Sequence, residues 1–538
     1  MLKQIVGIVN SFGLSLEVPA FEFGDLSIPI FRLDKEKIEK LKEKLRKIEG
    51  IEKIEEVGGF VNLTIKNDQK LKFIEENIKG KGDKGKEKKE KILIEHTSIN
   101  PNASPHIGRA RNAIIGDCLA RLLTFCGYDV ERHYYVNDIG KQIAMLALLC
   151  KGNEKFADLL KIYQMAAEKI EKDKEFEKEV FKILEKIEAG NWQVLKKIKK
   201  IVKNAVTGQK AILEKIGVTF DYFDYESDFL NRAKQLVDEI YKKGLGMKDS
   251  EGKIVFDLRG SGLEKGMKEP FVALTRPNGT TLYLTRDLAY TIWKISRASK
   301  NIIVLGEDQK LYFSELSFIL RKLGYEPPRA IHYSMVLLQS AEGISKMSTR
   351  AGTLILLDEF FNELTKKLKE ESEKRKARLS KKQIEMLASN IIRYTIARID
   401  YNKNVLFDIA RAIKLEGDTA VYLNYTLARA LSILKKLKLK KKPKKIKLDS
   451  LEEKEARLLH ALFAFPFTLE KAKEGLNIVL IAHYLYSLCR TFNDFYENCS
   501  IIKAKKDEKT RRIALLLLSI EIIKSCFKIL GLHGLERI

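Results

Sequence analysis

Hydrophobic residues recur along this chain with two different periods, and the change from one period to the other predicts its elements. In residues 35–48 they recur every three or four positions, which predicts an amphipathic helix. In residues 59–66 every second residue is aliphatic, which predicts a strand with one face on the core and with Phe60 and Asn62 on the outer face. Together these elements predict a small α/β module over residues 1–77.

Short apolar runs separated by helical patterns begin at residue 91. The runs of strand type are residues 92–94, 129–136, 301–308 and 330–338. Strands that alternate with helices predict a doubly wound parallel sheet, a Rossmann-like α/β domain, over residues 91–380. A helical stretch rich in Lys and Glu, at about residues 146–216, interrupts this alternation, so we expect it to be an insertion with solvated charged faces.

The remaining segments are a linker and a helical region. Residues 78–90 consist mainly of Lys, Gly and Glu, which is typical of a solvated linker. Within it, residues 80–86 fit the phosphate-loop pattern GxxxxGK, but Glu87 stands where that pattern requires Ser or Thr, and no strand precedes it. We therefore reject a phosphate loop. Residues 381–538 follow a helical pattern, which predicts an all-α C-terminal domain that contains a lysine-rich run at 435–447.

Composition narrows the choice of partners and of cellular compartment. The 99 Lys and Arg residues outnumber the 73 Asp and Glu residues, and the net charge of +26 fits either a polyanionic partner or a lysine-biased, solvated surface. The six cysteines form no CxxC pair and have no His at zinc spacing, so we predict no metal site and a reducing, cytoplasmic location. Apolar stretches are shorter than the ~18 residues of a membrane span, so no membrane partner is predicted.

Two polar segments carry the candidate chemistry. The first, residues 95–116, reads EHTSINPNASPHIGRARNAIIG and directly follows a predicted strand. A helix that starts at His106 and Gly108 would offer free N–H groups and a positive dipole end to a phosphate, and His106 could donate to its oxygens. The second segment, residues 345–352, reads SKMSTRAG, and its cations would neutralise phosphate charge together with His106.

These segments resemble the HIGH and KMSKS signatures of class I aminoacyl-tRNA synthetases, and more narrowly those of arginyl-tRNA synthetases. The resemblance implies catalytic roles for residues of both signatures: His106, Gly108, Arg109, Lys346, Ser348 and Arg350. It implies an ATP site, with Mg²⁺ bound together with ATP, formed by Ser104, His106, Gly108, Met335, Val336, Lys346 and Met347. Arg109 replaces the second histidine of the first signature, and Thr349 replaces the second lysine of the other.

Acids in two separate segments indicate a cationic amino-acid substrate. Glu95 and Asp287 could pair with the planar guanidinium of arginine, since a carboxylate binds this group through two parallel hydrogen bonds. Tyr283, four residues before Asp287, would form a wall of the same pocket, and Asn100 would hold the main-chain end of the amino acid. The resemblance adds Glu315, which stands where a substrate-contacting glutamine is expected.

The resemblance also implies the reaction and the partners. The reaction is ATP-dependent activation of L-arginine to arginyl-adenylate with release of pyrophosphate, followed by transfer of arginine to the 3′ end of tRNA(Arg). The enzyme would be a monomer with a tRNA-contacting N-terminal module and an anticodon-binding C-terminal domain. An exposed ring beside an amide, Phe60 with Asn62, could stack on and hydrogen-bond an unpaired base. Aromatic and basic side chains of the C-terminal domain would also contact tRNA: Tyr422, Tyr425, Arg429, Phe492 and Tyr496.

Three other functions compete with this one. Another class I synthetase, such as one for cysteine, would be supported by a zinc-binding set of cysteines, which this sequence lacks. A tRNA-binding protein without catalysis would fit the change at Arg109, but not the largely intact lysine loop and the complete substrate pocket. A small-molecule adenylyl-forming ligase of the same superfamily would not need RNA-binding modules at both ends of the chain.

Overall fold

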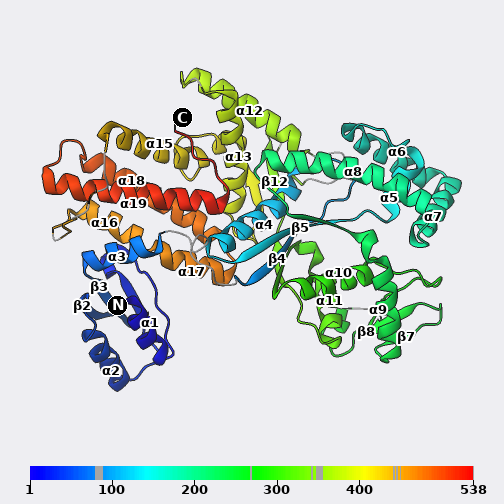
Figure 1. Ribbon diagram of the computed structural model, residues 1–538, viewed down its shortest axis with the longest axis horizontal. Helices are drawn as coiled ribbons and strands as arrows, with labels where there is room; N and C mark the ends of the chain where they lie inside the picture. Colours follow the sequence, from blue (N-terminus) through cyan, green and yellow to red (C-terminus); the bar gives the residue numbers. More distant parts are fainter. Residues whose placement is uncertain are drawn as a thin grey trace. The chain divides into compact units, whose positions relative to one another are not determined.

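The structure is a computed structural model of the 538-residue chain, and it describes residues 1–78, 89–266, 269–340, 343–346, 355–377, 379–439, 443, 446–448 and 450–536. The chain divides into two compact units. The first unit consists of Met1–Asp83 together with Lys414–Ile538, and the second consists of Lys84–Ile413. The first unit therefore contains both ends of the chain, and the second contains the predicted parallel sheet (Figure 1).

A five-stranded parallel sheet forms the core of the second unit, with the strand order β11-β10-β4-β5-β6. Its strands are β4 (Lys91–Thr97), β5 (Asp129–Val136), β6 (Tyr222–Tyr225), β10 (Lys300–Gly306) and β11 (Arg329–Tyr333). The chain enters at the central strand β4, builds one half through β5 and β6, and returns to add β10 and β11 on the other side. The predicted doubly wound sheet is confirmed, and its switch point lies between β4 and β10.

Helix α4 (Ile107–Phe125) packs against three strands of this sheet, β4, β5 and β10. Apolar residues on nearly all of its turns are buried, as expected for a helix at the centre of a unit. At Gly116 the helix approaches β4 so closely that a Cβ atom would lie 1.9 Å from Cβ of His96. A side chain at this position would push the helix away from the strand, so the close approach requires glycine.

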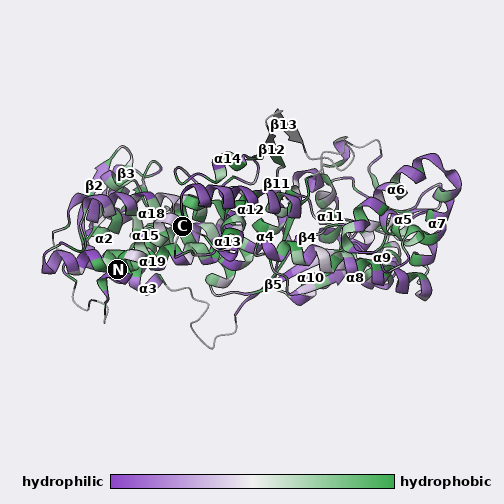
Figure 2. Cartoon of the chain, turned by 90° about the horizontal axis from the view of Figure 1, so that it is seen from above, coloured by the Kyte–Doolittle hydropathy of each residue, from purple (hydrophilic) through white to green (hydrophobic). Residues whose placement is uncertain are grey.

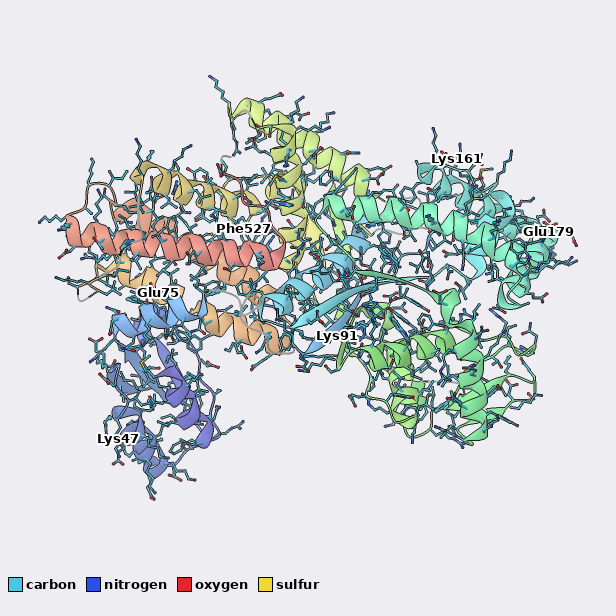
Figure 3. All side chains as sticks on the ribbon, in the orientation of Figure 1. Lys47, Glu75, Lys91, Lys161, Glu179 and Phe527 are labelled. Carbon is cyan, nitrogen blue, oxygen red and sulfur yellow. The ribbon has the colours of Figure 1, made fainter. Side chains whose placement is uncertain are left out.

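The predicted insertion is helical. It consists of α5 (Lys141–Leu149), α6 (Leu159–Lys172), α7 (Lys174–Glu188) and α8 (Trp192–Lys215). Hydrophilic and hydrophobic residues lie side by side on α6 and α7 (Figure 2). The exposed side chains of Lys161 on α6 and Glu179 on α7 mark its solvent side (Figure 3), so the charged faces are solvated, as the sequence predicts.

A small antiparallel sheet in the second unit was not predicted. Its strands are β7 (Gly246–Lys248), β8 (Ile254–Asp257) and β9 (Phe271–Ala273). It shares one apolar core with α9 (Leu230–Lys242), α10 (Tyr283–Arg297) and α11 (Lys310–Lys322). This core fixes α10 and α11. A turn at residues 277–279 leads into α10 through the Thr275–Thr281 bridge.

The prediction of one strand over residues 330–338 is wrong, because the chain changes sheet at this point. After β11, the amide N–H of Ser334 donates to the carbonyl of Tyr401, and that of Met335 donates to the side chain of Asn404. The next strand, β12 (Val336–Ser340), pairs with β13 (Gly343–Lys346) and β14 (Val405–Phe407) in a separate sheet. Helices α12 (Leu357–Lys374), α13 (Lys381–Ala397) and α14 (Ile409–Ala412) complete the unit.

The N-terminal part of the first unit is the predicted small α/β module. Its antiparallel sheet has the order β1-β3-β2, with β1 (Leu26–Pro29), β2 (Ile51–Val57) and β3 (Phe60–Ile65). Its helices are α1 (Leu2–Ser11), α2 (Lys35–Arg46) and α3 (Asn67–Asn77). Leu41 and Leu45 of α2 are buried, so the predicted helix has the expected inner face.

The predicted exposure of Asn62 is wrong. Because β3 is the central strand, Asn62 lies opposite Ser27 of β1 and accepts a hydrogen bond of 2.7 Å from its hydroxyl. Asn62 is only 8% exposed. Phe60 is half-buried, and its ring packs edge-on against Phe31 at 5.0 Å. Neither side chain therefore forms the open platform that alternation alone suggests.

The C-terminal part of the first unit is helical, as predicted. It contains α15 (Ala420–Leu437), α16 (Glu453–Phe463), α17 (Phe465–Gly475), α18 (Val479–Asn498) and α19 (Lys506–Leu530). Helix α19 packs against α15, α16 and α18, and Phe527 (Figure 3) is one of its many buried residues. Within the described ranges, no helix is both long and apolar enough to cross a membrane. The six cysteines, all of which are described, form no disulfide.

Candidate active site

A cavity of about 310 Å³ opens at the carboxyl ends of β4 and β10, at the switch point of the parallel sheet. Ligands of open α/β sheets bind at this position because the loops on the two sides of the switch point diverge there. Glu95 and Thr97 line the cavity from β4, and Leu305 and Gly306 line it from β10. The fold alone therefore makes this cavity the first candidate for a binding site.

The first signature forms the start of α4, as predicted. His106 is the N-cap residue, and a Cβ atom at Gly108 would lie 2.9 Å from Cε1 and from Nδ1 of His106, so glycine leaves room for the ring. Burial, and secondly the nearby Arg109, lower the pKa of His106 to about 4. His106 is therefore neutral near pH 7 in the free protein. In this state it is available as a hydrogen-bond donor, and its supply of positive charge to bound ATP stays a prediction.

The segment that follows the second signature in the sequence lies beside His106. Leu357 donates its amide N–H to the carbonyl of Pro105 at 2.8 Å, and Ile107 donates to Ile355 at 3.3 Å. The hydroxyl of Ser104 donates to Asp358 of α12 at 3.0 Å. Lys346 is the last residue of β13, whereas the predicted site residues Met347, Ser348 and Arg350 lie outside the described residues. Backbone contacts thus bring residues some 250 positions apart in the chain to one place.

Met335 and Val336, which are predicted to bind ATP, lie at the start of β12: Met335 directly precedes the strand and Val336 is its first residue. Met335 is 54% exposed, and its carbonyl accepts from the amide N–H of Val405 at 2.9 Å. Val336 is buried and pairs with Val405 across the two strands. Arg111 of α4 also donates to the Met335 carbonyl, at 3.2 Å. The start of β12 is therefore tied to the helix that begins at His106.

The structure brings together four of the five residues predicted to bind the amino acid. Glu95, Asn100, Tyr283 and Asp287 all line the cavity. Tyr283 is 60% exposed at its mouth, in the first turn of α10 and one turn before Asp287. Asp287 accepts a hydrogen bond from the hydroxyl of Tyr312, and burial, together with the nearby carboxylate of Glu95, raises the pKa of Asp287 to about 6. Two acids from β4 and α10 thus meet in one cavity.

Glu315, the fifth of these residues, does not line the cavity. It is half-buried on α11, and burial raises its pKa. Gln309, which the sequence reasoning did not select, lines the cavity from the turn after β10. Its position directly after a buried strand could have identified it, because the carboxyl ends of parallel strands carry the ligand-binding side chains.

Sequence reasoning also missed the aromatic and basic walls of the cavity. The rings of Tyr135 and Tyr290 stack with 4.5 Å between their centroids. The Tyr135 hydroxyl is buried, and it faces the carboxylate of Asp287. Lys294 donates to Glu95 inside the cavity. Tyr290 and Lys294 lie three and seven residues after Asp287 on one face of α10, so helical spacing could have identified them, whereas nothing in the sequence links Tyr135 of β5 to this face.

Three of the residues predicted to bind tRNA form a cluster in the first unit. The guanidinium of Arg429 lies 4.7 Å from the ring centroid of Tyr425 and 4.9 Å from that of Tyr496. Arg429 donates to Asn493 and to the Tyr425 hydroxyl, both at 2.9 Å. Both tyrosines are 37% exposed. A held guanidinium between two accessible rings is suited to stacking on bases.

The other two residues of that set are packed inside the helices. Phe492 is fully buried at 0% exposure against Phe495, with 6.2 Å between the ring centroids, so the expectation that it contacts tRNA is corrected. Tyr422 is half-buried, and its hydroxyl accepts a hydrogen bond of 2.9 Å from Asn493. Tyr422 thus helps to position Arg429, because the side chain of Asn493 hydrogen-bonds both residues.

A parallel sheet that carries a HIGR helix start and a cavity at its switch point, followed by a strand that ends in the KMSTR lysine, defines a class I aminoacyl-tRNA synthetase. The comparisons with known proteins agree. Residues 74–409 match the family of class I tRNA synthetases (R), catalytic domain, and residues 423–538 match the DALR anticodon binding domain.

Curated relatives identify the family more closely. The chain is 34% identical to the arginine–tRNA ligase of Methanocaldococcus jannaschii, with 99% of this chain and 97% of the relative covered. It is 32% identical to that of Archaeoglobus fulgidus, with 100% and 99% covered. The chain belongs to the arginyl-tRNA synthetase family, whose members are ATP-dependent aminoacyl-tRNA ligases. A cysteine-specific enzyme and a small-molecule ligase are thereby excluded.

Solved structures support the same fold over the whole chain. The Thermus thermophilus arginyl-tRNA synthetase superimposes with a TM-score of 0.84 at 23% identity, with 100% of this chain and 99% of that chain covered. The enzyme from Plasmodium falciparum gives a TM-score of 0.81 at 17% identity, with 100% and 98% covered. The fold is therefore retained where most residues differ.

Proposed function

We propose that the cavity at the switch point binds arginine while this family's reaction proceeds. In that reaction the carboxylate of arginine attacks the α-phosphate of ATP, and pyrophosphate leaves. A hydroxyl of the terminal ribose of tRNA(Arg) then attacks the carbonyl carbon of arginyl-adenylate, and AMP leaves. Because the phosphoryl step needs no covalent enzyme intermediate, catalysis consists of positioning and of charge stabilisation.

The observation that carries the proposal is the meeting of Glu95 and Asp287 in one cavity. Two carboxylates give the flat, doubly donating guanidinium acceptors on two of its edges. Tyr283 would close the pocket at its mouth, and Asn100 would bind the main-chain end of the substrate. Gln309 would supply the glutamine contact to the substrate that the sequence suggested for position 315, because Gln309 lines the cavity and Glu315 does not.

The phosphates of ATP would lie at the start of α4. The helix offers its first N–H groups there, Gly108 permits close approach, and His106 and Arg109 add side-chain donors. Ser104, Met335 and Val336 would hold the nucleoside, and Lys346, Met347, Ser348 and Arg350 would close over the phosphates. Mg²⁺ would bind with ATP, to which it supplies charge neutralisation and phosphate ligation. Among the described residues, no group of three or more His, Cys, Asp or Glu side chains is placed to hold a metal ion by itself.

The tRNA would contact both ends of the chain. The cluster of Tyr425, Arg429 and Tyr496 offers stacking surfaces, and Phe60 offers a half-exposed ring. The proposed modules are a tRNA-contacting module (1–77), a linker (78–90), a catalytic domain with the insertion at about 146–216, and an anticodon-binding domain. The sequence suggested 91–380 and 381–538 for the last two, but α13, β14 and α14 belong to the second unit, so we propose that the anticodon-binding domain begins near Lys414. We also propose that the protein acts as a cytoplasmic monomer, which sedimentation at micromolar concentration would test.

The direct test is charging of tRNA(Arg) with labelled arginine in the presence of ATP and Mg²⁺, with lysine as the competing amino acid. Asp287→Asn should raise the KM for arginine about 100-fold, because a neutral amide loses the charge-assisted pair. Asp238→Asn, at an exposed position on α9, is the matched control and should behave as the wild type. Unchanged arginine kinetics in Asp287→Asn would overturn the assignment of the arginine site, and charging with lysine would overturn the substrate.

A further inference from the structure

A buried lysine lies inside the proposed arginine pocket. Lys294, in the last turn of α10, lines the cavity and is only 1% exposed. Its ammonium donates to Oε2 of Glu95, and it lies 4.3 Å from the ring centroid of Tyr290. A buried ammonium is costly unless it is paired, so a lysine in a pocket for a cationic substrate requires an explanation.

The charges around the cavity supply that explanation. Among the described residues, the charged side chains that line it are the acids Glu95, Asp287 and Asp308 and the bases Arg109 and Lys294. This set leaves one net negative charge when all five groups are ionised. Arginine carries two positive groups and one negative group, so it brings one net positive charge. The pocket with Lys294 and the substrate therefore neutralise each other.

Without Lys294, two acids would face each other in a partly buried cavity. Burial and Glu95 raise the pKa of Asp287, whereas Lys294 acts in the opposite direction. The other titratable groups near the pair are phenols and an ion pair, which do not replace a lysine cation. They are Tyr135, Tyr290 and Tyr312, Asp224, which accepts from Tyr290, and the Arg286–Glu226 pair. Close carboxylates that lack a cation share a proton, and a protonated acid is a poor partner for a guanidinium.

We propose that Lys294 is a positioning residue for arginine recognition: its ammonium holds Glu95 by one oxygen and places a cation beside the two acids, Glu95 and Asp287, that bind the guanidinium. The inference rests on the proposed arginine site. It assigns Lys294 no contact with the reacting atoms. Oε2 of Glu95 accepts from Lys294, and Oδ2 of Asp287 accepts from the Tyr312 hydroxyl, so Oε1 of Glu95 and Oδ1 of Asp287 remain as acceptors for the substrate.

The test uses the full-length enzyme and three variants. Lys294→Gln keeps a donor to Glu95 but removes the charge, and Lys294→Arg keeps the charge. Lys300→Gln is the matched control, because Lys300 is exposed and pairs with Glu90 at the surface. KM and kcat for arginine and for ATP are measured by charging of tRNA(Arg) between pH 5.5 and 8.5.

In the wild type, kcat/KM for arginine should fall as the pH drops below about 6, where Asp287 becomes protonated. Lys294→Gln should move this acidic limb upward by about one pH unit and raise the KM for arginine about tenfold at pH 7, with the KM for ATP unchanged. Lys294→Arg should retain the wild-type limb, and Lys300→Gln should match the wild type throughout.

The outcomes separate the inference from the proposal on which it rests. An unmoved limb in Lys294→Gln, or equal increases of KM for arginine and ATP, would overturn the role of Lys294. If Lys294→Gln does not fold, Lys294→Arg decides: a limb shifted from that of the wild type contradicts the inference, and a retained limb supports it. If Asp287→Asn leaves the KM for arginine unchanged, the arginine site itself is wrong.

Discussion

The buried charges of this protein are each held by several contacts, and Arg111 is the clearest case. It is 0% exposed, and its guanidinium donates to the carbonyls of Ser334, Met335, Asp400, Tyr401 and Lys403 at 2.7–3.2 Å. Burial lowers the pKa of Arg111 to about 10, so it stays charged near pH 7. One side chain on α4 thus joins the start of β12 to the loop before β14.

Replacing Arg111 by lysine should cost about 3 kcal/mol of unfolding free energy, because an ammonium has too few donors and several buried carbonyls lose their partners. The KM for ATP should rise as well, since Met335 and Val336 are the proposed nucleoside contacts. Urea unfolding and charging kinetics measure the two effects. Arg321→Lys, at an exposed position near the end of α11, is the control. A loss of stability with an unchanged KM for ATP would separate the residue from the ATP site.

The carboxylate of Asp287 lowers the unfolding free energy of the substrate-free protein. Its pKa of about 6 lies above the ordinary value of 3.8, so the folded protein takes up this proton at a higher pH than the unfolded chain. Asp287 therefore destabilises the substrate-free protein above about pH 6, and this penalty disappears as the pH falls towards 4.

Asp287→Asn should consequently raise the unfolding free energy at pH 8, by at most about 3 kcal/mol, while it weakens arginine binding. At pH 4 the gain should vanish. Chemical denaturation at the two pH values, without arginine, measures it. An equal gain at both values would show that the carboxylate is not the source.

At the scale of elements, α4 links the sheet to the site. Its buried middle packs on β4, β5 and β10, and its first turn presents His106, Gly108 and Arg109. The distance between helix and strand is set at Gly116, where the ring of His96 fills the space that a side chain would occupy. His96 is itself fixed by stacking on Phe220 at 4.9 Å. The position of the proposed phosphate site therefore depends on this contact.

Gly116→Ala should cost roughly 2–3 kcal/mol and lower kcat, because the new methyl group would force the helix away from β4 and displace His106. Gly7→Ala is the matched control: Gly7 lies in α1 with no atom within 4 Å of its added Cβ, and this change should stabilise by about 0.5–1 kcal/mol. Thermal unfolding and charging rates give both values. Wild-type activity in Gly116→Ala would mean that the helix does not set the site.

At the scale of the whole molecule, three buried groups join the two ends of the chain inside the first unit. Lys70 of α3 pairs with Asp25 at 3.0 Å, and Nδ1 of His460 on α16 lies 3.2 Å from Asp25. Nε2 of His460 faces the carbonyl of Pro19 at 3.1 Å. Burial raises the pKa of Asp25, but His460 and Lys70 outweigh it and lower the net value.

Removal of this acid should loosen the N-terminal module from α16. Asp25→Asn leaves two buried bases without their anion, and we expect a loss of about 3–5 kcal/mol. Because folding lowers the pKa of Asp25, its contribution is complete above pH 4 and is lost as the pH falls through the lowered value. Hydrogen exchange of α3 and α16 measures the loosening.

The double variant Asp25→Asn with Lys70→Met is the control for this prediction. It removes the acid together with one of its bases, so it should recover part of the loss. If the double variant loses as much unfolding free energy as the single variants Asp25→Asn and Lys70→Met lose together, the two residues are not coupled.

Local sequence determined the elements and the chemistry of the signatures. The apolar runs predicted β4 and β10, because a strand buried on both faces needs a continuous apolar run whatever its neighbours are. Residues 129–136 were predicted as a strand with the bounds of β5, although only the second half of that strand is buried throughout. The helical pattern predicted the insertion and the C-terminal helices for the same reason. His106 and Gly108 were recognised from the short first signature. Glu95 and Asp287 were recognised as acids suited to a guanidinium, in two separate segments that the family resemblance places in one pocket.

Only the tertiary structure decided which side chains share a cavity and which are covered. Tyr135, Lys294, Gln309 and Glu95 lie far apart in sequence, and they meet because the sheet order places β10 beside β4. Asn62 and Phe492 are buried because other segments cover faces that their own periodicity leaves open. The hydrophobic period of a segment predicts only that segment's own inner and outer faces. The burial of a side chain and the charge balance of a site depend on all the segments packed around them.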